Sequence, residues 1–433
     1  MAMIDIERVQ LAPVPEGIRE FAIDRPTTGA GLGVYDIQFA GWTMDETSRP
    51  REVALYSGDE LIRRAPIDQP RPDVAERYPE ADAAAVSGFN TFVNVVGLEP
   101  GAPLSLRLLV HDGEPRQLAT VTYRHQPLVS AYTPRLQPLL LTTLGRAGTT
   151  WTMRLLSEHP GIAIHRAHPY ELRIARHWLH SFKILTEPRD PEHSAHADTF
   201  HHSKSWAGHN PFYPIPLGVT PGLREWYGKT YVEEYAATVQ RWIDECYGRI
   251  AAGQGTSDPV YFAEKHRADG LPWVAWELYP RAKEVFLVRD FRDVISSMLA
   301  FNAKHGRQVF GPKQPISDEA FVHFVRNGPI RLVSTSWRKR HDRAILIRYE
   351  DLIRKPVATV RDILTYLELD ASPATIERML ERAAAENPDM SRHRTSSAVS
   401  SSLGRWRTSL SPSVQSVCDE VLGDVLRQFG YEV

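Results

Sequence analysis

The sequence is poor in cysteine, since only Cys246 and Cys418 occur in 433 residues. Both fall within apolar helical patterns, where a buried free thiol is more common than a disulfide or a pair of metal ligands. We therefore expect neither a disulfide-stapled secreted fold nor a cysteine-based zinc site. The scarcity fits a reducing compartment, and we expect a cytoplasmic protein.

The sequence also lacks an excess of charge of either sign, because 51 Lys and Arg oppose 53 Asp and Glu. No global field favours nucleic acid or an acidic membrane, so any anion site must be local. No apolar run approaches the roughly 20 residues that span a bilayer, and the first residues lack the basic start and apolar core of a targeting signal. We expect a soluble protein without a membrane span or a nucleic-acid partner. The abundance of Arg and Ala relative to Lys suggests a bacterial origin.

The length predicts about two domains. Apolar and polar residues alternate in short runs from about residue 30 to 126, and turn signals such as Asp112-Gly113 separate the runs. This pattern is typical of short antiparallel strands and predicts a small all-β sandwich domain over residues 1–130. A proline-rich stretch then marks the start of a second domain, residues 131–433.

In this second domain, short apolar runs alternate with helical patterns. A parallel sheet with helices on both faces produces this order, because its strands are buried on both sides. We therefore predict an α/β fold with a parallel sheet. The expected strand–helix units lie at about 139–159, 283–301 and 343–369.

The stretch LTTLGRAGTTW, residues 141–151, is close to a nucleotide-binding P-loop but lacks its lysine. An apolar strand, a glycine turn and a helix expose backbone N–H groups at the positive end of the helix, which suits phosphate or sulfate. In an NTPase a lysine stands between the last glycine and the hydroxyl residue, where this chain has Thr149. Arg146 lies inside the loop instead. The loop therefore suits an anion that side chains neutralise without a metal.

With the motif Arg146-Ala147-Gly148-Thr149-Thr150-Trp151, the chain resembles the sulfotransferases that use 3′-phosphoadenosine-5′-phosphosulfate (PAPS). Their first signature has the form [KR]-[SAG]-G-T-[TS]-W. The resemblance implies that Arg146 and the amides and hydroxyls of 148–150 hold the 5′-phosphosulfate, and that Trp151 stacks on adenine. The alternative is an ordinary helix-opening turn with a tryptophan in the core.

The second signature of this family is an arginine at a strand end with a serine eight residues later. Arg289 and Ser297 have that spacing in VFLVRDFRDVISSML, with Phe291 where the family usually has proline. The resemblance assigns both residues to the 3′-phosphate, and a guanidinium and a hydroxyl are suited to that contact. We expect Arg292 and Asp293 to pair locally.

A third match lies near the C-terminus, where SSSLGRWRTSLS resembles the G-x-W-[KR] segment that closes over the nucleotide. Gly404, Trp406 and Arg407 fit this pattern. The Arg-Lys-Gly triplet of eukaryotic cytosolic members is replaced by Val399-Ser400-Ser401, so hydroxyls or Arg405 would take over part of the phosphate contact. The matches extend over about residues 139–433.

Two residues compete for the role of general base. His266, in the strand-like stretch VYFAEKHRADGLP, matches the base position of cytosolic sulfotransferases, although their K-T-H triplet is changed here to Glu264-Lys265-His266. Glu171 matches the glutamate that serves as base in some bacterial and carbohydrate sulfotransferases. Either residue can instead be an ordinary polar residue. Lys265 or Arg146 would stabilise the oxygen that bridges phosphate and sulfate.

A histidine-rich stretch, residues 193–209, invites a metal-site interpretation, but its spacings fit no zinc pattern. We expect no metal there and favour an acceptor-binding loop. The long polar stretch 301–321 is a candidate lid over the acceptor.

The sequence thus predicts a metal-independent, PAPS-dependent sulfotransferase that releases 3′-phosphoadenosine-5′-phosphate (PAP). Its acceptor would be a hydroxyl of a carbohydrate or small metabolite. A nucleotide kinase or NTPase is the alternative enzyme, and a glycan-binding protein without catalysis is the alternative of another class. The acceptor, the oligomeric state and the role of the N-terminal domain stay open.

Overall fold

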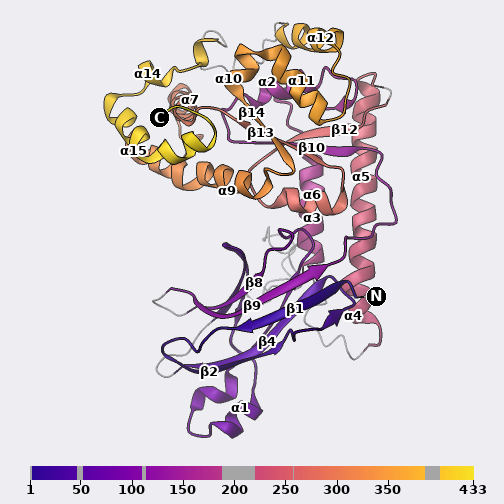
Figure 1. Ribbon diagram of the computed structural model, residues 1–433, viewed down its shortest axis with the longest axis vertical. Helices are drawn as coiled ribbons and strands as arrows, with labels where there is room; N and C mark the ends of the chain where they lie inside the picture. Colours follow the sequence, from indigo (N-terminus) through magenta and orange to yellow (C-terminus); the bar gives the residue numbers. More distant parts are fainter. Residues whose placement is uncertain (1, 46–51, 110–113, 188–219, 257, 386–399) are drawn as a thin grey trace. The chain divides into compact units, whose positions relative to one another are not determined.

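The computed structural model describes residues 2–45, 52–109, 114–187, 220–256, 258–385 and 400–433 (Figure 1). The chain divides into two compact units. The first comprises Met1–Thr133, His177–Arg241 and Trp273–Leu278, and the second comprises Pro134–Arg176, Trp242–Pro272 and Tyr279–Val433. The first unit therefore includes two stretches, His177–Arg241 and Trp273–Leu278, that the sequence patterns placed in the second domain.

The first unit contains two antiparallel sheets, of strand order β3-β1-β9-β8-β5-β6 and β2-β4-β7. Both sheets contribute to one hydrophobic core, as Ile37 on β4 and Leu106 on β8 show. The predicted antiparallel strands are confirmed, whereas the predicted Asp112-Gly113 turn lies outside the described residues. The strands are β1 (Ile4–Leu11), β2 (Ile18–Arg25), β3 (Gly31–Leu32), β4 (Asp36–Asp45), β5 (Glu52–Ser57), β6 (Glu60–Pro66), β7 (Gly88–Asn94), β8 (Leu104–Leu109) and β9 (Arg116–His125).

Short helices complete this unit, and three longer helices have residues in both units. The short ones are α1 (Pro72–Arg77), η1 (Asp82–Val86), α4 (Leu223–Glu225) and the π-helical η5 (Trp226–Thr230). The helices that the division crosses are α3 (Ile174–Thr186), α5 (Tyr231–Gly253) and α6 (Leu271–Leu278).

The second unit is built on a parallel sheet of order β11-β12-β10-β13-β14. Its strands are β10 (Gln137–Thr143), β11 (Ile162–Ala163), β12 (Tyr261–His266), β13 (Lys283–Val288) and β14 (Ala344–Arg348). The central strand β10 leads into the predicted phosphate loop, and the register pairs Leu141 with Lys265 on β12. The predicted parallel α/β fold is confirmed.

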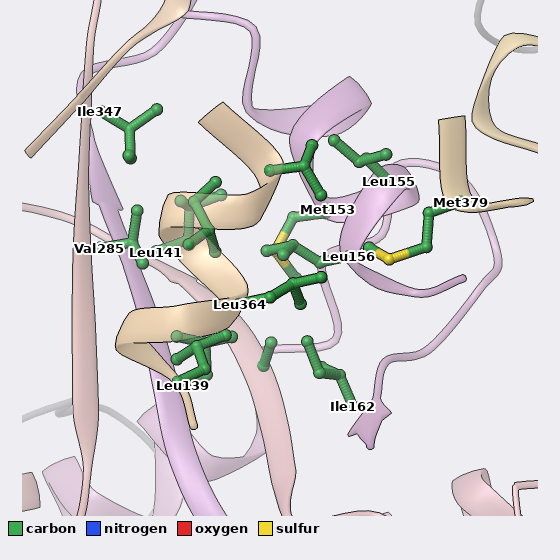
Figure 2. Packing of buried hydrophobic residues seen from close by; sticks show 14 of the residues in the cluster. Leu139, Leu141, Met153, Leu155, Leu156, Ile162, Val285, Ile347, Leu364 and Met379 are labelled. Carbon is green, nitrogen blue, oxygen red and sulfur yellow. The ribbon is translucent and has the colours of Figure 1, made fainter. Parts of the chain in front are cut away.

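Helices cover both faces of this sheet, because alternate residues of each strand point to opposite sides. On β13, Val285 and Leu287 pack in a cluster with α2, α11 and α12 (Figure 2). Phe286 and Val288 pack in a second cluster with α7, α8 and α15. Each fully buried apolar side chain contributes roughly 1.5–3 kcal/mol, so these two clusters hold the strand ends in place.

The helices of this unit begin and end as follows: α2 (Thr149–Leu156), α7 (Phe291–His305), α8 (Asp318–Val325), the π-helical η6 (Arg326–Ile330), α9 (Arg331–Arg340), α10 (Tyr349–Arg354), α11 (Pro356–Tyr366), α12 (Pro373–Ala384), η7 (Ser400–Ser402), α14 (Trp406–Ser409) and α15 (Pro412–Gln428). Within the described ranges, no helix is both long enough and apolar enough to cross a bilayer. Both cysteines carry free thiols, with Cys418 buried in the second cluster and Cys246 half-buried.

Candidate functional site

A cavity of about 820 Å³ opens in the second unit, where β10, β12 and β13 end. The carboxyl edge of a parallel sheet is the usual ligand site of such folds, because the loops after the strands meet there. Among the described residues that line it, seven are lysine or arginine, one is His266, and one, Glu171, is acidic. The lysine and arginine residues are Arg146, Arg173, Arg176, Lys265, Arg267, Arg289 and Arg405. The cavity therefore concentrates positive charge in a chain whose net charge is −2.

The phosphate loop owes its shape to residues in the left-handed backbone region. Gly148, at the N-cap of α2, has φ 88°, and a Cβ there would lie 2.3 Å from Cε2 of Tyr349. Arg146 has φ 71°, which is uncommon for a residue with a side chain. The first N–H groups of a helix have no partner within the helix, so those of Thr149 and Thr150 are available to an anion at this end of α2.

The lysine that the loop lacks in sequence is supplied from the neighbouring strand. Lys265 on β12 donates hydrogen bonds to Oγ1 of Thr150 (3.1 Å) and to the carbonyl oxygen of Pro169 (2.7 Å). Burial lowers the pKa of Lys265 to about 8, and the nearby Glu171 opposes this shift. The ammonium of Lys265 thus lies beside the hydroxyl of Thr150, although the lysine position of the motif itself is occupied by Thr149.

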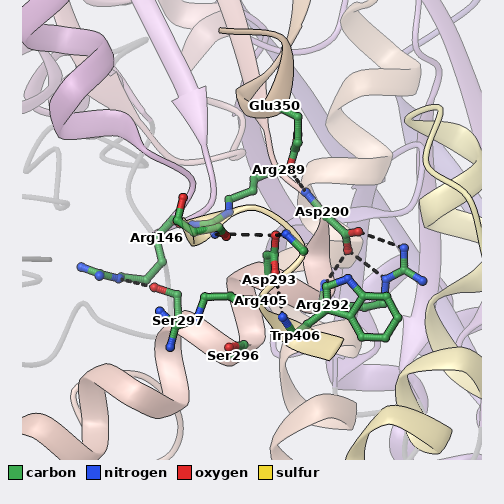
Figure 3. A network of polar contacts seen from close by, with 12 residues as sticks. Arg146, Arg289, Asp290, Arg292, Asp293, Ser296, Ser297, Glu350, Arg405 and Trp406 are labelled. Atoms are coloured by element: carbon green, nitrogen blue, oxygen red, sulfur yellow. Dashed lines mark hydrogen bonds and ion pairs between the residues drawn. The ribbon is translucent and has the colours of Figure 1, made fainter. Parts of the chain in front are cut away.

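A second group of cations lies beside the loop, around Arg289 (Figure 3). Arg289 donates to the carbonyl oxygens of Arg146 (3.2 Å) and of Ser402. The Nε of Arg146 donates to Oγ of Ser297 (3.1 Å). Burial, followed by the charges of Arg289 and Arg405, lowers the pKa of Arg146 to about 10. Burial and Arg289 likewise lower the pKa of Arg405. Guanidinium groups gathered this closely, with two of their pKa values lowered, form a site for a polyanion.

Asp293 ties the C-terminal segment to this cation group. Its carboxylate accepts from the backbone N–H groups of Gly404 (2.7 Å) and Trp406 (3.0 Å), and lies 3.7 Å from Nη2 of Arg289. Burial raises the pKa of Asp293, while Arg289 opposes that shift. Arg292 pairs with Asp290 (2.9 Å) and does not point to the cavity.

Three residues nominated from the sequence lie outside the described cavity lining. Ala147 is buried beneath the loop, and Gly404 contributes its amide to Asp293. The Trp406 ring is buried in the helical cluster, with the guanidiniums of Arg292 and Arg407 at 4.2 and 4.5 Å from its centre. Trp151, in contrast, lines the cavity while packing partly on the core.

The segment of residues 349–352, which follows β14 and begins α10, supports the site. Glu350 accepts from the backbone N–H of Asp290 (3.0 Å) and from the hydroxyl of Tyr431 (2.8 Å). The ring of Tyr349 lies under the guanidinium of Arg289, 5.1 Å away. This segment therefore holds Asp290 and Arg289 in place.

The two candidate bases have different surroundings. His266 has a buried side chain, and neither ring nitrogen has a hydrogen-bond partner among the described residues. Burial, followed by the charge of Arg176, lowers the pKa of His266 to about 3. Glu264 is buried beside it and accepts from Tyr247 and from the backbone N–H groups that begin α3, so it anchors that helix.

Glu171 lies on the cavity wall with 27% of its side chain exposed, paired with Arg173. Tyr170 and Arg173 on either side have φ 61° and 27°, in the left-handed region that residues with side chains seldom adopt. Such backbone costs on the order of 1–3 kcal/mol and clusters at functional sites. The segment thus holds a carboxylate at the cavity near Lys265.

The structure describes the predicted lid but not the histidine-rich stretch. The histidine-rich stretch 193–209 lies outside the described residues. In the part of the chain that is described, no group of three or more His, Cys, Asp or Glu residues is placed to hold a metal ion. From the candidate lid, Val309, Phe310 and Gly311 line the cavity.

Sequence reasoning missed an apolar side of the cavity. It is lined by Met298, Val309, Phe310, Phe324, Pro329, Leu332 and Val333. The only signal in the sequence is the four-residue spacing of Phe324, Gly328 and Leu332, which is also the spacing of an ordinary core helix.

Comparison with known proteins gives a consistent family match. A profile described as "Sulfotransferase family" matches residues 138–373. Carbohydrate sulfotransferase 3 of Tetronarce californica is 25% identical over 161 residues, which are 35% of this chain and 36% of that protein. The chain thus spans only about a third of the length of this relative.

Solved structures with some likeness are also sulfotransferases. Mouse sulfotransferase SULT7A1, complexed with PAP, is 12% identical, with 70% of this chain and 90% of that chain covered and a TM-score of 0.39. Sulfotransferase STF9 from Mycobacterium avium is 16% identical, with 70% and 79% covered and a TM-score of 0.35.

Proposed function

Since the chain belongs to the sulfotransferase family, we propose that it transfers a sulfuryl group from PAPS to a hydroxyl of a carbohydrate or small-molecule acceptor. The observation that carries the choice of donor is the presence of two cation groups at one phosphate loop. One is Lys265, which donates to the loop hydroxyl of Thr150, and the other comprises Arg146, Arg289 and Arg405. A nucleotide with phosphate groups at both its 5′ and 3′ positions matches this arrangement.

The two groups would hold different parts of the donor. The amides that open α2, with Lys265 and Thr150, would hold the 5′-phosphosulfate. Arg289, Ser297 and Arg405 would hold the 3′-phosphate through charge-assisted hydrogen bonds. Trp151 offers a partly exposed ring for the adenine.

For the chemical step, the chain would position the acceptor and neutralise the charge that develops on the departing phosphate. Sulfuryl transfer, like phosphoryl transfer, should pass through a loose in-line transition state. The acceptor oxygen forms a bond to sulfur while the bond from sulfur to the bridging oxygen breaks, and PAP leaves. Lys265 would stabilise that oxygen, and the acceptor proton would go to Glu171. Glu171 suits this role better than His266, because a buried imidazole with a pKa of about 3 is a weak base.

The kinase alternative is less favoured by the lining of the cavity. A kinase or NTPase site holds Mg²⁺ through a carboxylate beside the P-loop hydroxyl. Here the one carboxylate in the described lining, Glu171, pairs with Arg173. Next to Thr150 lies the ammonium of Lys265 instead.

Thermal stabilisation by PAP, compared with ATP plus Mg²⁺, tests the proposal. PAP at 100 times its Kd should add about 2.7 kcal/mol to the free energy of unfolding, and Arg289→Ala should lose most of that gain. Arg361→Ala, an exposed arginine on α11, is the matched control and should keep it. Stronger stabilisation by ATP plus Mg²⁺, or a full response of Arg289→Ala to PAP, would contradict the proposal. Binding of PAP without sulfation of any hydroxyl compound would favour a protein that only binds.

A further inference from the structure

The cavity has one wall of hydrocarbon, which the two phosphate groups of the proposed nucleotide do not explain. The wall consists of Met298, Val309, Phe310, Phe324, Pro329, Leu332 and Val333. Three of these side chains belong to the large apolar residues that the chain leaves exposed, with Val309 43%, Phe324 42% and Leu332 49% accessible. Exposed apolar side chains gathered in one concave place mark a surface that another molecule covers.

The local fold explains why these side chains share a face. Helix α8 passes through the π-helical turn η6 into α9, and Pro329 lies inside that turn. Phe324, Gly328 and Leu332 follow each other at intervals of four residues, which places them along one side of the continuous helical segment. π-helical turns are frequent at functional sites.

The apolar wall begins directly at the phosphate loop. A Cβ on Gly145 would lie 3.1 Å from Cε1 of Phe310 and 4.0 Å from Cε of Met298. Phe310 also packs edge-on against Phe301, whose ring lies 4.7 Å from the guanidinium of Arg146. A molecule lying along this wall can therefore present one end to the anion held by the loop.

The polar part of the lining offers a free sugar few carboxylate or amide acceptors. Among the described lining residues there is no Asp, Asn or Gln, and the single Glu is Glu171. Sugar hydroxyls need acceptors and donors in alternation, and hydroxyls buried without partners are costly. Hydrocarbon, in contrast, gains from covering Phe324 and Leu332.

We propose that the sulfate acceptor carries its hydroxyl on an extended hydrocarbon body, an alkyl chain or alkyl-substituted ring, that lies along this wall. The inference rests on the proposed sulfotransferase function and narrows its acceptor class. The hydroxyl end would face Glu171 and the loop, and the hydrocarbon would cover Phe310, Phe324 and Leu332.

Calorimetric titration of the full chain saturated with PAP tests this inference. The probes are 4-ethylphenol, 4-butylphenol and 4-octylphenol, together with a phenol that carries a diether chain as long as octyl. Affinity should rise by about fourfold for each methylene that reaches the wall. The diether compound has the same length but less apolar surface, so it should bind far more weakly than 4-octylphenol.

Variants of the wall separate its role from that of the nucleotide site. The double variant Phe324→Ser/Leu332→Ser changes two exposed side chains and should retain the fold. In this variant the affinity for the alkylphenols should depend less on alkyl chain length, and the affinity for PAP should equal that of the parent. Val357→Ser on α11 is the control, since Val357 is 41% exposed and lies outside the described cavity lining. It should leave both properties unchanged.

Equal affinity for the octyl and diether compounds would overturn the inference, as would an unchanged chain-length dependence in the double variant. Tighter binding of glucose than of 4-octylphenol to the PAP-bound chain would do the same. Failure of PAP itself to bind would count against the proposed function instead. In that case the same titrations without PAP would still show whether the wall binds hydrocarbon.

Discussion

The Nε of Arg146 donates a hydrogen bond of 3.1 Å to Oγ of Ser297, although 151 residues separate them along the chain. The motif resemblance placed Arg146 at the 5′-phosphosulfate and Ser297 at the 3′-phosphate. In the structure the Arg146 guanidinium lies with Ser297 and the ring of Phe301, while Lys265 is the cation that contacts Thr150. Lys265 therefore serves the hydroxyl end of the loop, and Arg146 faces the second proposed phosphate site.

If Arg146 and Ser297 bind the nucleotide as a pair, the losses of PAP affinity on substituting each of them should not be additive. Arg146→Ala should weaken PAP binding by about 10- to 100-fold, because hydrogen bonds to charged groups contribute roughly 1.5–3 kcal/mol. Ser297→Ala should cost less in the Arg146→Ala background than in the parent, since residues in contact couple. Calorimetry on the four proteins of the cycle measures this coupling. Ser296→Ala is the control, because its hydroxyl contacts Ser409 (2.6 Å). Strictly additive losses would show that the contact does not matter for binding.

Removing the proposed base should affect turnover and spare nucleotide affinity. We expect Glu171→Gln to lower kcat by about 10²- to 10⁴-fold, the usual contribution of general acid–base catalysis. The affinity for PAP should stay within about twofold, as judged by calorimetry. His266→Gln should lower kcat much less, because burial already makes this imidazole a weak base. An equal loss in a His266→Gln protein that is still fully folded would transfer the role to His266.

Nucleotide affinity should fall as the pH rises through about 8. Burial lowers the pKa of Lys265 to about 8, so above that pH the free protein increasingly carries a neutral lysine. A bound anion favours the charged form, and binding above pH 8 must therefore first restore a proton. The Kd for PAP, measured at pH 7, 8 and 9, should increase by up to tenfold per pH unit above 8. Lys265→Met should bind weakly with a flatter profile. An unchanged slope in that variant would assign the pH dependence to another group.

A buried ion pair beneath the sheet should matter for stability. Nε of Arg340 lies 3.4 Å from Oε2 of Glu284, both side chains are almost fully buried, and Thr142 donates to the same carboxylate. Burial raises the pKa of Glu284 to about 7, an effect that Arg340 opposes.

Arg340→Met should lower the free energy of unfolding by about 3–5 kcal/mol, because it leaves a buried carboxyl group without its cation. The double variant Arg340→Met/Glu284→Gln should recover part of this loss. Urea denaturation measures both, with the exposed Arg338→Met on the same helix expected to change stability by less than about 0.5 kcal/mol. A double variant less stable than Arg340→Met would contradict this account.

Features that depend on neighbouring residues could be predicted from the sequence. The strand, turn and helix around Gly148 follow from an apolar run, two glycines and a helical pattern, and the structure has β10, a left-handed Gly148 and α2 in that order. Arg289 and Ser297 share the cavity because a strand end and the following helix place them there. The alternation of strands and helices likewise predicted the parallel sheet.

Features that depend on distant residues could not be predicted in the same way. Trp406 was expected over the nucleotide but is buried against α7, because the amides around it are bound by Asp293, 113 residues away. The burial of Glu264 beside His266 depends on contacts of β12 with α3 and α5, which no motif encodes. The hydrocarbon wall combines residues of a loop with residues of separate helices. The spacing of the apolar residues within each helix is the same as in an ordinary core helix, so it did not reveal the wall.

The sequence by itself determined that this chain has a lysine-free phosphate loop and a second arginine–serine site on a parallel sheet, since both are short-range patterns of propensity and spacing. Only the tertiary structure decided which cation serves the loop. The parallel register that pairs Leu141 with Lys265 places an ammonium beside Thr150, and the packing of α7 directs Arg146 to Ser297. Register and helix packing are set by burial summed over whole faces of the sheet, so they follow from the complete fold and not from any one motif.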